Sequence, residues 1–166
     1  VSSETVLAHI RRATQGKISL VNTHPFQFAQ WVFAHNGNLP NFEEHREEIL
    51  ARVSPKFKRF ILGNTDSEVF FFLLLTNMSS YLNIDSHNVD FNLMVSAIRK
   101  TIDEILEVFG EMGKKENETD NDNPYLTFLL TNGKMMLAHH GGKSLNYSTY
   151  KNRCDDRDIC PSYADE

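Results

Sequence analysis

The chain has 166 residues, of which 40% are hydrophobic and 23% charged, and this composition predicts one globular domain with its own core. The net charge of −5 gives no reason to expect a nucleic acid or an acidic membrane as a partner. The longest apolar run, Val69 to Leu75, is too short to span a bilayer. Two cysteines, Cys154 and Cys160, do not make a disulfide framework, so we expect a cytoplasmic protein.

The first third of the chain reads as short strands joined by polar loops. The β-rich stretch Thr5–Ile10 predicts a buried strand, and Lys17–Val21 a second strand or a loop edge. Asn22–Phe26 is expected to be a loop, followed by a strand over Gln30–Ala34. His35-Asn36-Gly37 then reads as a tight turn, because asparagine and glycine both tolerate a positive φ.

Three helices are predicted in the middle of the chain. The first covers Asn41–Val53, with Asn41 as its N-cap. The second begins at Thr65 and runs to about Leu82; Thr65 and Glu68 stand at capping-box spacing, and its apolar surface predicts deep burial. The third covers Asp90–Met112, where apolar residues recur at three- and four-residue steps.

The last third returns to strands. Lys114–Asn123 is a charged loop. Tyr125–Leu130 and Lys134–His139 flank an Asn-Gly pair and predict a hairpin, and Leu145–Tyr150 is a candidate strand in an irregular tail. Strands, then helices, then strands predict an α+β fold with an antiparallel sheet.

Polar clusters stand where four of these stiff elements end or begin, which is where a site can be held rigidly. They are Arg11–Thr14, Asn22–Pro25, His35–Gly37 and Asn64–Glu68. Each alone has an ordinary structural explanation: surface charge for Arg11, a turn for Asn36-Gly37, and a favourable helix N-terminal acid for Asp66.

Taken together, the stretches AHIRRAT, NTHPF, FAHNGNL and NTDSE resemble the class II glutamine amidotransferases in their order and spacing, and the YLTFLLTNGKMMLAHH hairpin resembles a later strand pair of that family. The resemblance looks closest to its stand-alone branch, which includes γ-glutamyl hydrolases of thiol metabolism. It implies the N-terminal nucleophile hydrolase fold, an αββα sandwich of two antiparallel sheets. The resemblance covers roughly residues 5–150, so we expect residues 1–150 to be a partial domain of this family and 151–166 a tail that continues into a longer parent.

The resemblance also implies roles for individual residues. Arg11 matches the arginine that binds the α-carboxylate of glutamine, as a guanidinium fork suits a carboxylate, and Thr14 lines the same pocket. Asp66 matches the carboxylate that binds the α-ammonium group. Asn36 and Gly37 match the oxyanion hole, through a side-chain amide and a backbone N–H.

Two further residues are expected near this site with less defined roles, His24 as a substrate-binding residue and Trp31. The family's nucleophile is an N-terminal cysteine, whereas this chain begins with Val1 and has no cysteine before Cys154. We therefore expect the nucleophile and the first strands of the sandwich to lie outside this chain, and the chain alone to be inactive.

Three functions remain open from the sequence. The first is hydrolysis of the side-chain amide of glutamine through a cysteinyl thioester, releasing glutamate and ammonia. The second is hydrolysis of γ-glutamyl amides such as glutathione, and the third is amino-acid binding without catalysis.

The expected partner is a small molecule, and the sequence leaves open self-association or a separate acceptor enzyme. No cofactor is implied. The histidines at positions 9, 24 and 35 lack a ligand pattern with carboxylates or cysteines, so no metal site is expected.

Overall fold

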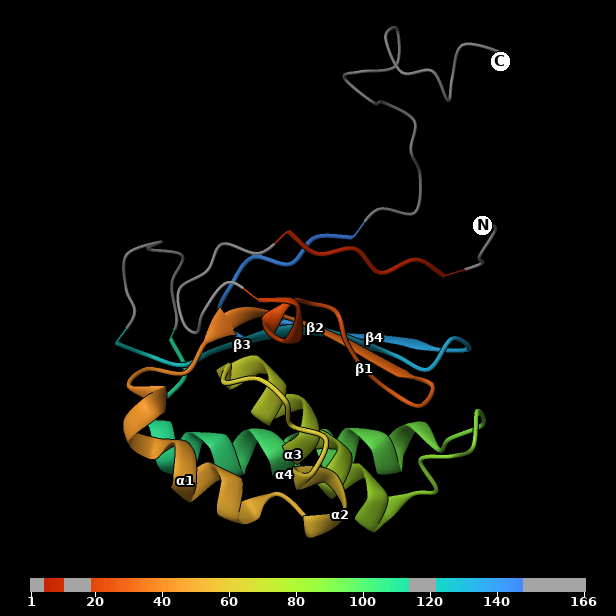
Figure 1. Cartoon of the computed structure of the whole chain (residues 1–166). Helices are drawn as coiled ribbons and strands as arrows, with labels where there is room; N and C mark the ends of the chain where they lie inside the picture. Colours follow the sequence, from red (N-terminus) through yellow and green to blue (C-terminus); the bar gives the residue numbers. More distant parts are fainter. Residues whose placement is uncertain (1–4, 11–18, 114–121, 148–166) are drawn as a thin grey trace, which may run out of the picture.

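An antiparallel sheet lies against a layer of helices in the computed structural model, which describes residues 5–10, 19–113 and 122–147 (Figure 1). The sheet has the strand order β1-β2-β3-β4. Its strands are β1 (Phe26–Phe28), β2 (Trp31–Asn38), β3 (Tyr125–Thr131) and β4 (Met136–His139). The two central strands pair over the whole length of β3, from Val32 opposite Thr131 to Asn38 opposite Tyr125.

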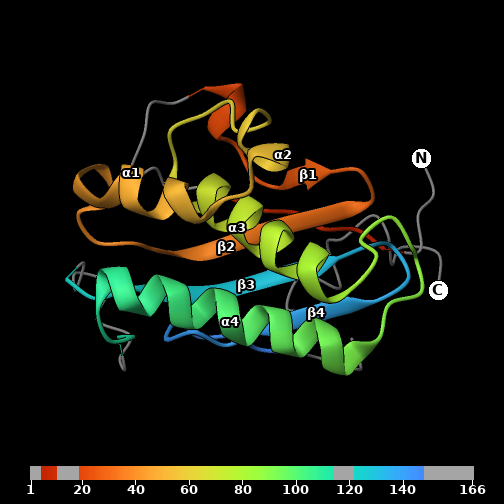
Figure 2. The same cartoon turned by 90° about the horizontal axis from the view of Figure 1, so that it is seen from below.

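The α-helices all lie on one face of this sheet, and α3 and α4 run side by side beneath it (Figure 2). Along the chain the α-helices are α1 (Phe42–Arg52), α2 (Pro55–Lys58), α3 (Asp66–Tyr81) and α4 (Phe91–Phe109), and the 3-10 helix η1 (Leu20–Asn22) precedes β1. Segments 5–10 and 140–147 lie on the opposite side of the sheet. None of the described helices is both long and apolar enough to cross a membrane.

Helix α3 is buried on nearly all sides because it packs between the sheet and the other helices. The Phe33 ring of β2 stacks on Phe71, with ring centroids 5.3 Å apart, and meets the edge of Phe70 at 5.2 Å. Phe128 of β3 also packs against Phe33, at 5.4 Å. These aromatic contacts fix the first half of α3 directly beneath β2, and this places the helix N-terminus near the end of that strand.

Helix α4 is amphipathic, and its buried residues recur along one face of the helix, as the sequence predicts: Met94, Ala97, Ile98, Thr101, Ile105 and Phe109. One polar link joins it to α3. The Asn77 amide donates to Thr101 Oγ1 at 3.1 Å and to Glu104 Oε2 at 2.8 Å. Since buried amides need partners, this link also fixes the register of the two helices.

The predicted α+β class with an antiparallel sheet is confirmed. The described residues form one sheet and one helical layer, which is half of an αββα sandwich. The helix and hairpin predictions agree with the structure to within a few residues. Asn41 is the N-cap of α1, but its φ is 50° and its side chain makes no capping hydrogen bond.

Two strand predictions before residue 22 are not borne out among the described residues. Thr5–Ile10 forms no strand, and Val6 and Ile10 are 76% and 99% exposed, so a β-rich composition alone does not create a strand without a neighbour. Leu20–Asn22, where Lys17–Val21 was expected to be extended or a loop, is a 3-10 helix. Phe26, expected to end a loop, begins β1.

Other predictions fall partly outside the described residues. Most of the charged loop Lys114–Asn123 lies there, as do residues 148–150 of the candidate strand Leu145–Tyr150, whose described residues 145–147 are not a strand. The division at residue 150 stays a prediction.

Candidate functional site

Three of the four polar clusters meet beside the N-terminus of α3. The Asn22 amide donates to Asn64 Oδ1 at 2.8 Å, and Asn64 N donates back to Asn22 Oδ1 at 3.1 Å. His35 lies 2.9 Å from the Ser67 hydroxyl, and Leu39 N donates to Asp66 Oδ2 at 2.8 Å. Segments that are far apart in sequence are thus joined by direct hydrogen bonds at one place.

The His35-Asn36-Gly37 cluster is not a turn, which corrects the sequence prediction. All three residues belong to β2, and Gly37 pairs with Leu126 of β3. Glycine is required there for space. A Cβ on Gly37 would lie 1.9 Å from Tyr125 O and 2.4 Å from His35 Nε2, closer than atoms approach. The missing side chain leaves room for the His35 ring to reach the Tyr125 carbonyl.

The hydrogen bonds of the buried His35 define its tautomer. Its Nε2 lies 2.8 Å from Tyr125 O, and since a carbonyl oxygen only accepts, Nε2 carries the hydrogen. In the neutral ring, Nδ1 then accepts from the Ser67 hydroxyl. Burial lowers the pKa of His35 below its ordinary value of 6.5, while the Asp66 carboxylate and the bond to Tyr125 act against this.

Hydrogen bonds of Thr65 and Glu68 fix the start of α3, the helix turn that carries Asp66. Thr65 caps the helix by accepting from Glu68 N at 3.3 Å, as the capping-box spacing predicts. The Glu68 carboxylate instead faces the preceding loop, where it accepts from Leu62 N at 2.9 Å and from Gly63 N at 2.7 Å. Burial raises the pKa of Glu68, and these two bonds oppose the shift. The loop before α3 is therefore anchored to the helix.

Asp66 itself is 5% exposed and uses both oxygens. Oδ2 accepts from Leu39 N, and Oδ1 accepts from Ser67 N at 2.7 Å, with the Ser67 hydroxyl 3.2 Å away. A carboxylate has about four acceptor positions, so these contacts orient the group and leave acceptor capacity for a cation.

The Gly37 N–H points away from β3. Leu126, its partner across the sheet, donates its own N–H to Gly141 O at 2.8 Å, on the far side of β3. Gly37 and Leu126 are therefore a non-hydrogen-bonded pair, and the Gly37 N–H is directed to the β1 side of β2. Strand β1 pairs only with residues 31–33, so it does not reach Gly37.

Asn36 lies between His35 and Gly37 in β2, so its side chain points to the face of the sheet opposite the helices. It is exposed, while His35 is buried on the helix face. Asn36 and Asp66 thus approach the end of β2 from different faces of the sheet. The Gly37 N–H, in the plane of the sheet, lies between them.

His24 and Trp31, the two residues expected near the site with less defined roles, lie in different places. His24 lies two residues before β1, on the side toward which the Gly37 N–H points, and its ring packs on His9 and Phe26 at 4.3 and 4.7 Å. Trp31 does not lie at the site, contrary to expectation. It begins β2, at the opposite end from Asn36, and its Nε1 donates to Ile84 O at 2.8 Å in the core.

Arg11 and Thr14 lie outside the described residues, so the predicted carboxylate pocket has no structural description. Ser67 and Asn22 were assigned no role from the sequence, although both stand within the polar clusters. Within the described part of the chain, no group of three histidine, cysteine, aspartate or glutamate side chains is arranged to hold a metal.

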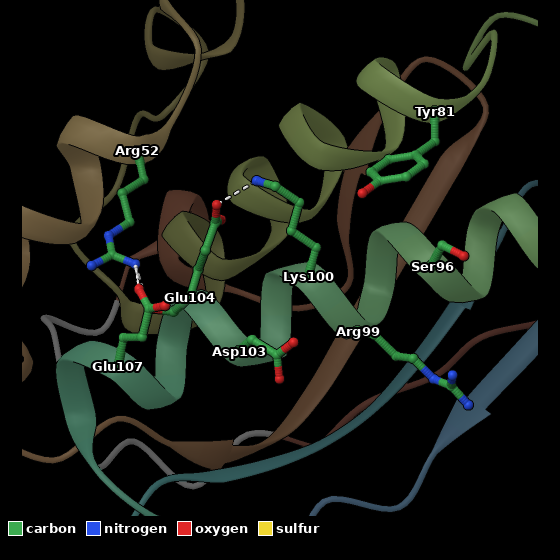
Figure 3. A pocket seen from close by; sticks show the side chains of 8 residues that line it. All are labelled: Arg52, Tyr81, Ser96, Arg99, Lys100, Asp103, Glu104 and Glu107. Carbon is green, nitrogen blue, oxygen red and sulfur yellow. Dashed lines mark hydrogen bonds and ion pairs between the residues drawn. The ribbon is translucent and has the colours of Figure 1, made fainter.

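A separate hollow of about 640 Å³ lies on the outer surface of the helices (Figure 3). Arg52 forms an ion pair with Glu107 at 2.7 Å across it, and Lys100 contacts Glu104. Its lining mixes both signs of charge and contains none of the four clusters: Arg52, Tyr81, Ser96, Arg99, Lys100, Asp103, Glu104 and Glu107. We do not assign the candidate site to it.

Comparison with known proteins shows the family of the chain. Residues 1–153 match the family model of the class II glutamine amidotransferases. A Saccharomyces cerevisiae protein named "Probable glutamine amidotransferase DUG3" is 33% identical over 140 residues, which cover 82% of this chain and 38% of the relative. An Escherichia coli glutamine–fructose-6-phosphate aminotransferase is 42% identical over 65 residues, or 39% of this chain and 10% of that enzyme.

A solved structure shows the same fold. The glutamine aminotransferase class-II domain protein from Silicibacter pomeroyi matches with a TM-score of 0.51 and 25% identity, over 76% of this chain and 50% of that one. The match confirms the fold class predicted from the sequence. The chain spans well under half the length of the yeast relative.

Proposed function

Because the chain belongs to the class II glutamine amidotransferase family, we propose that it supplies the head-group and oxyanion sites of an enzyme that hydrolyses the side-chain amide of glutamine. The observation that carries this proposal is the direction of the Gly37 N–H. It takes no part in the pairing of β2 with β3, and it neighbours the exposed amide of Asn36. Donors on a strand that pairs with β3 from Val32 to Asn38 suit a developing oxyanion.

In the proposed reaction a cysteine thiolate attacks the amide carbon of glutamine, and the carbonyl oxygen becomes an oxyanion. Asn36 Nδ2 and Gly37 N–H donate to that oxygen. The C–N bond then breaks and releases ammonia, which takes its third proton from the base. Water hydrolyses the remaining thioester to glutamate and restores the thiol. We place the cysteine and its α-amino base in a segment outside these 166 residues.

Asp66 would bind the α-ammonium group of the substrate, and Arg11 its α-carboxylate, with Thr14 beside it. The burial of Asp66 supports this role, because an ion pair in a partly dehydrated site is stronger than one in water. His24 would border the substrate on the β1 side. This arrangement recognises a free amino-acid head group and leaves the identity of the leaving group open.

The test is the release of glutamate by the full-length protein from glutamine and from glutathione. We expect Asn36→Ala to lower kcat about 100- to 1,000-fold with little change in KM, since an oxyanion donor acts in the transition state. Arg11→Ala should chiefly raise KM. Asn92→Ala, which removes an exposed amide on α4, is the matched control and should leave both constants unchanged.

Each alternative has its own outcome in this assay. Turnover of glutathione with none of glutamine would identify a γ-glutamyl hydrolase. Binding of glutamate without any turnover would identify an amino-acid-binding domain. A normal kcat in Asn36→Ala would contradict the oxyanion assignment.

A further inference from the structure

We infer that His35 and Ser67 are positioning residues that control how strongly Asp66 holds the substrate's ammonium group, an inference that rests on the proposed function. The side chains of His35, Ser67 and Asp66 form one continuous hydrogen-bonded network. His35 Nδ1 lies 2.9 Å from Ser67 Oγ, and Ser67 Oγ lies 3.2 Å from Asp66 Oδ1. All three are at most 5% exposed.

The Ser67 hydroxyl has a single hydrogen and two candidate acceptors. When His35 is neutral its Nδ1 is bare, because Nε2 holds the ring hydrogen against Tyr125 O. The hydroxyl then donates to Nδ1, at the shorter of the two distances. In this state Asp66 Oδ1 accepts only from Ser67 N and keeps a free acceptor position.

Protonation of His35 reverses the donor and acceptor roles in this hydrogen-bonded network. Nδ1 becomes a donor, so Ser67 Oγ accepts from it and its hydrogen turns to Asp66 Oδ1. The carboxylate then has one acceptor position fewer, and a cationic ring is within two hydrogen bonds of it. Both changes weaken the attraction of Asp66 for an ammonium group.

The groups that face His35 come from three elements. Asp66 of α3 favours the protonated ring, while His9 of the segment before η1 and His139 of β4 oppose it. Burial has the largest effect and lowers the pKa of the ring. At neutral pH the ring is therefore neutral, and the hydroxyl points away from Asp66.

The role of Gly37 follows from the same geometry. A side chain at this position would occupy the space between His35 Nε2 and Tyr125 O. The residues of the His35-Asn36-Gly37 sequence thus have two separate roles in the proposed site. Asn36 and the Gly37 N–H face the reacting oxygen, while His35 and the Gly37 Cα face inward and orient the ammonium site.

The experiment measures the binding of L-glutamate to the full-length protein by calorimetry between pH 5.5 and 8. We expect wild-type Kd to rise as the pH falls from 8 to 5.5 and His35 takes up a proton, by up to about tenfold when the ring is fully protonated, because one charge-assisted hydrogen bond is lost. Ser67→Ala should change less than threefold over the same range. Thr101→Val, which removes a buried hydroxyl bonded within α4 and to Asn77, should keep the wild-type profile.

A second measurement needs no variant. Nitrogen-15 NMR of the histidine rings should show His35 with its hydrogen on Nε2 at pH 8. A hydrogen on Nδ1, or equal pH profiles for wild type and Ser67→Ala, would overturn the inference and leave the proposed function standing. If the wild-type protein binds no glutamate at any pH, the proposed function and this inference both fail.

Discussion

The substitution Gly37→Ala tests why β2 has a glycine at the site. The added Cβ would lie 1.9 Å from Tyr125 O, a backbone atom of the neighbouring strand, so the two strands would have to separate by about 1 Å. Overpacking of this kind costs about 1–3 kcal/mol. The His35–Tyr125 hydrogen bond would be lost as well, for about 1–2 kcal/mol. Alanine is less flexible than glycine in the unfolded chain, which offsets about 0.5–1 kcal/mol. The net loss should be about 1–4.5 kcal/mol.

The measurement is urea denaturation of the full-length protein, read as a shift in the midpoint at constant slope. Gly110→Ala is the matched control. Gly110 has a φ of +85° and a ψ of −168°, and nothing lies within 4 Å of an added Cβ, so only backbone strain of about 1–3 kcal/mol is expected there. If Gly37→Ala loses no more stability than Gly110→Ala, close approach of the strands is not the reason for the glycine.

Three further predictions concern stability. Glu68→Gln should lower the free energy of unfolding by about 1–3 kcal/mol in urea titrations, because one of two loop N–H groups loses its acceptor; an unchanged midpoint would contradict this. Since burial lowers the pKa of His35, the unfolded chain takes up its proton at a higher pH than the folded one. Stability should therefore fall as the pH drops below 6.5 toward the folded pKa, and His35→Gln should remove that part of the slope; equal slopes in both proteins would argue against it. Asp90→Ala should cost about 1 kcal/mol, because Asp90 caps α4 by accepting from Leu93 N at 3.0 Å, and a thermal melt should detect it.

Local signals in the sequence predict the helices well. Thr65 and Asp90 cap the helices that follow them, and the apolar spacing of α4 marks the face that it buries. These features depend on neighbours within one or two turns, so a single sequence contains them. Even here Glu68 departs from a capping box. Its carboxylate accepts from backbone N–H groups of the preceding loop and not from that of the N-cap residue.

The strands are harder to predict, because their partners lie far away in the chain. His35-Asn36-Gly37 has the chemistry of a turn, yet it pairs with residues 126–128 and continues as a strand. The close approach of Tyr125 explains the glycine, and no local pattern contains that contact. Ile10 shows the reverse case, a β-branched residue that is 99% exposed.

The candidate site was partly predictable for the same reason. The polar clusters at Asn22, His35 and Asp66 indicated where side chains would gather, and the structure joins them. The roles of Ser67 and of the His35 ring depend on distances between elements that are far apart in sequence, so the sequence alone does not show them. Trp31, expected near the site from the family resemblance, lies at the other end of β2 and bonds to Ile84 O in the core.

We propose that Asp66 and its neighbours recognise the free head group of a γ-glutamyl compound. The decisive measurement is calorimetry of the full-length protein with L-glutamate and with N-acetyl-L-glutamate. Acetylation, which removes the ammonium charge, should weaken binding about 10- to 100-fold, and Asp66→Asn should largely abolish this difference. Equal affinities of the wild-type protein for the two compounds would contradict it.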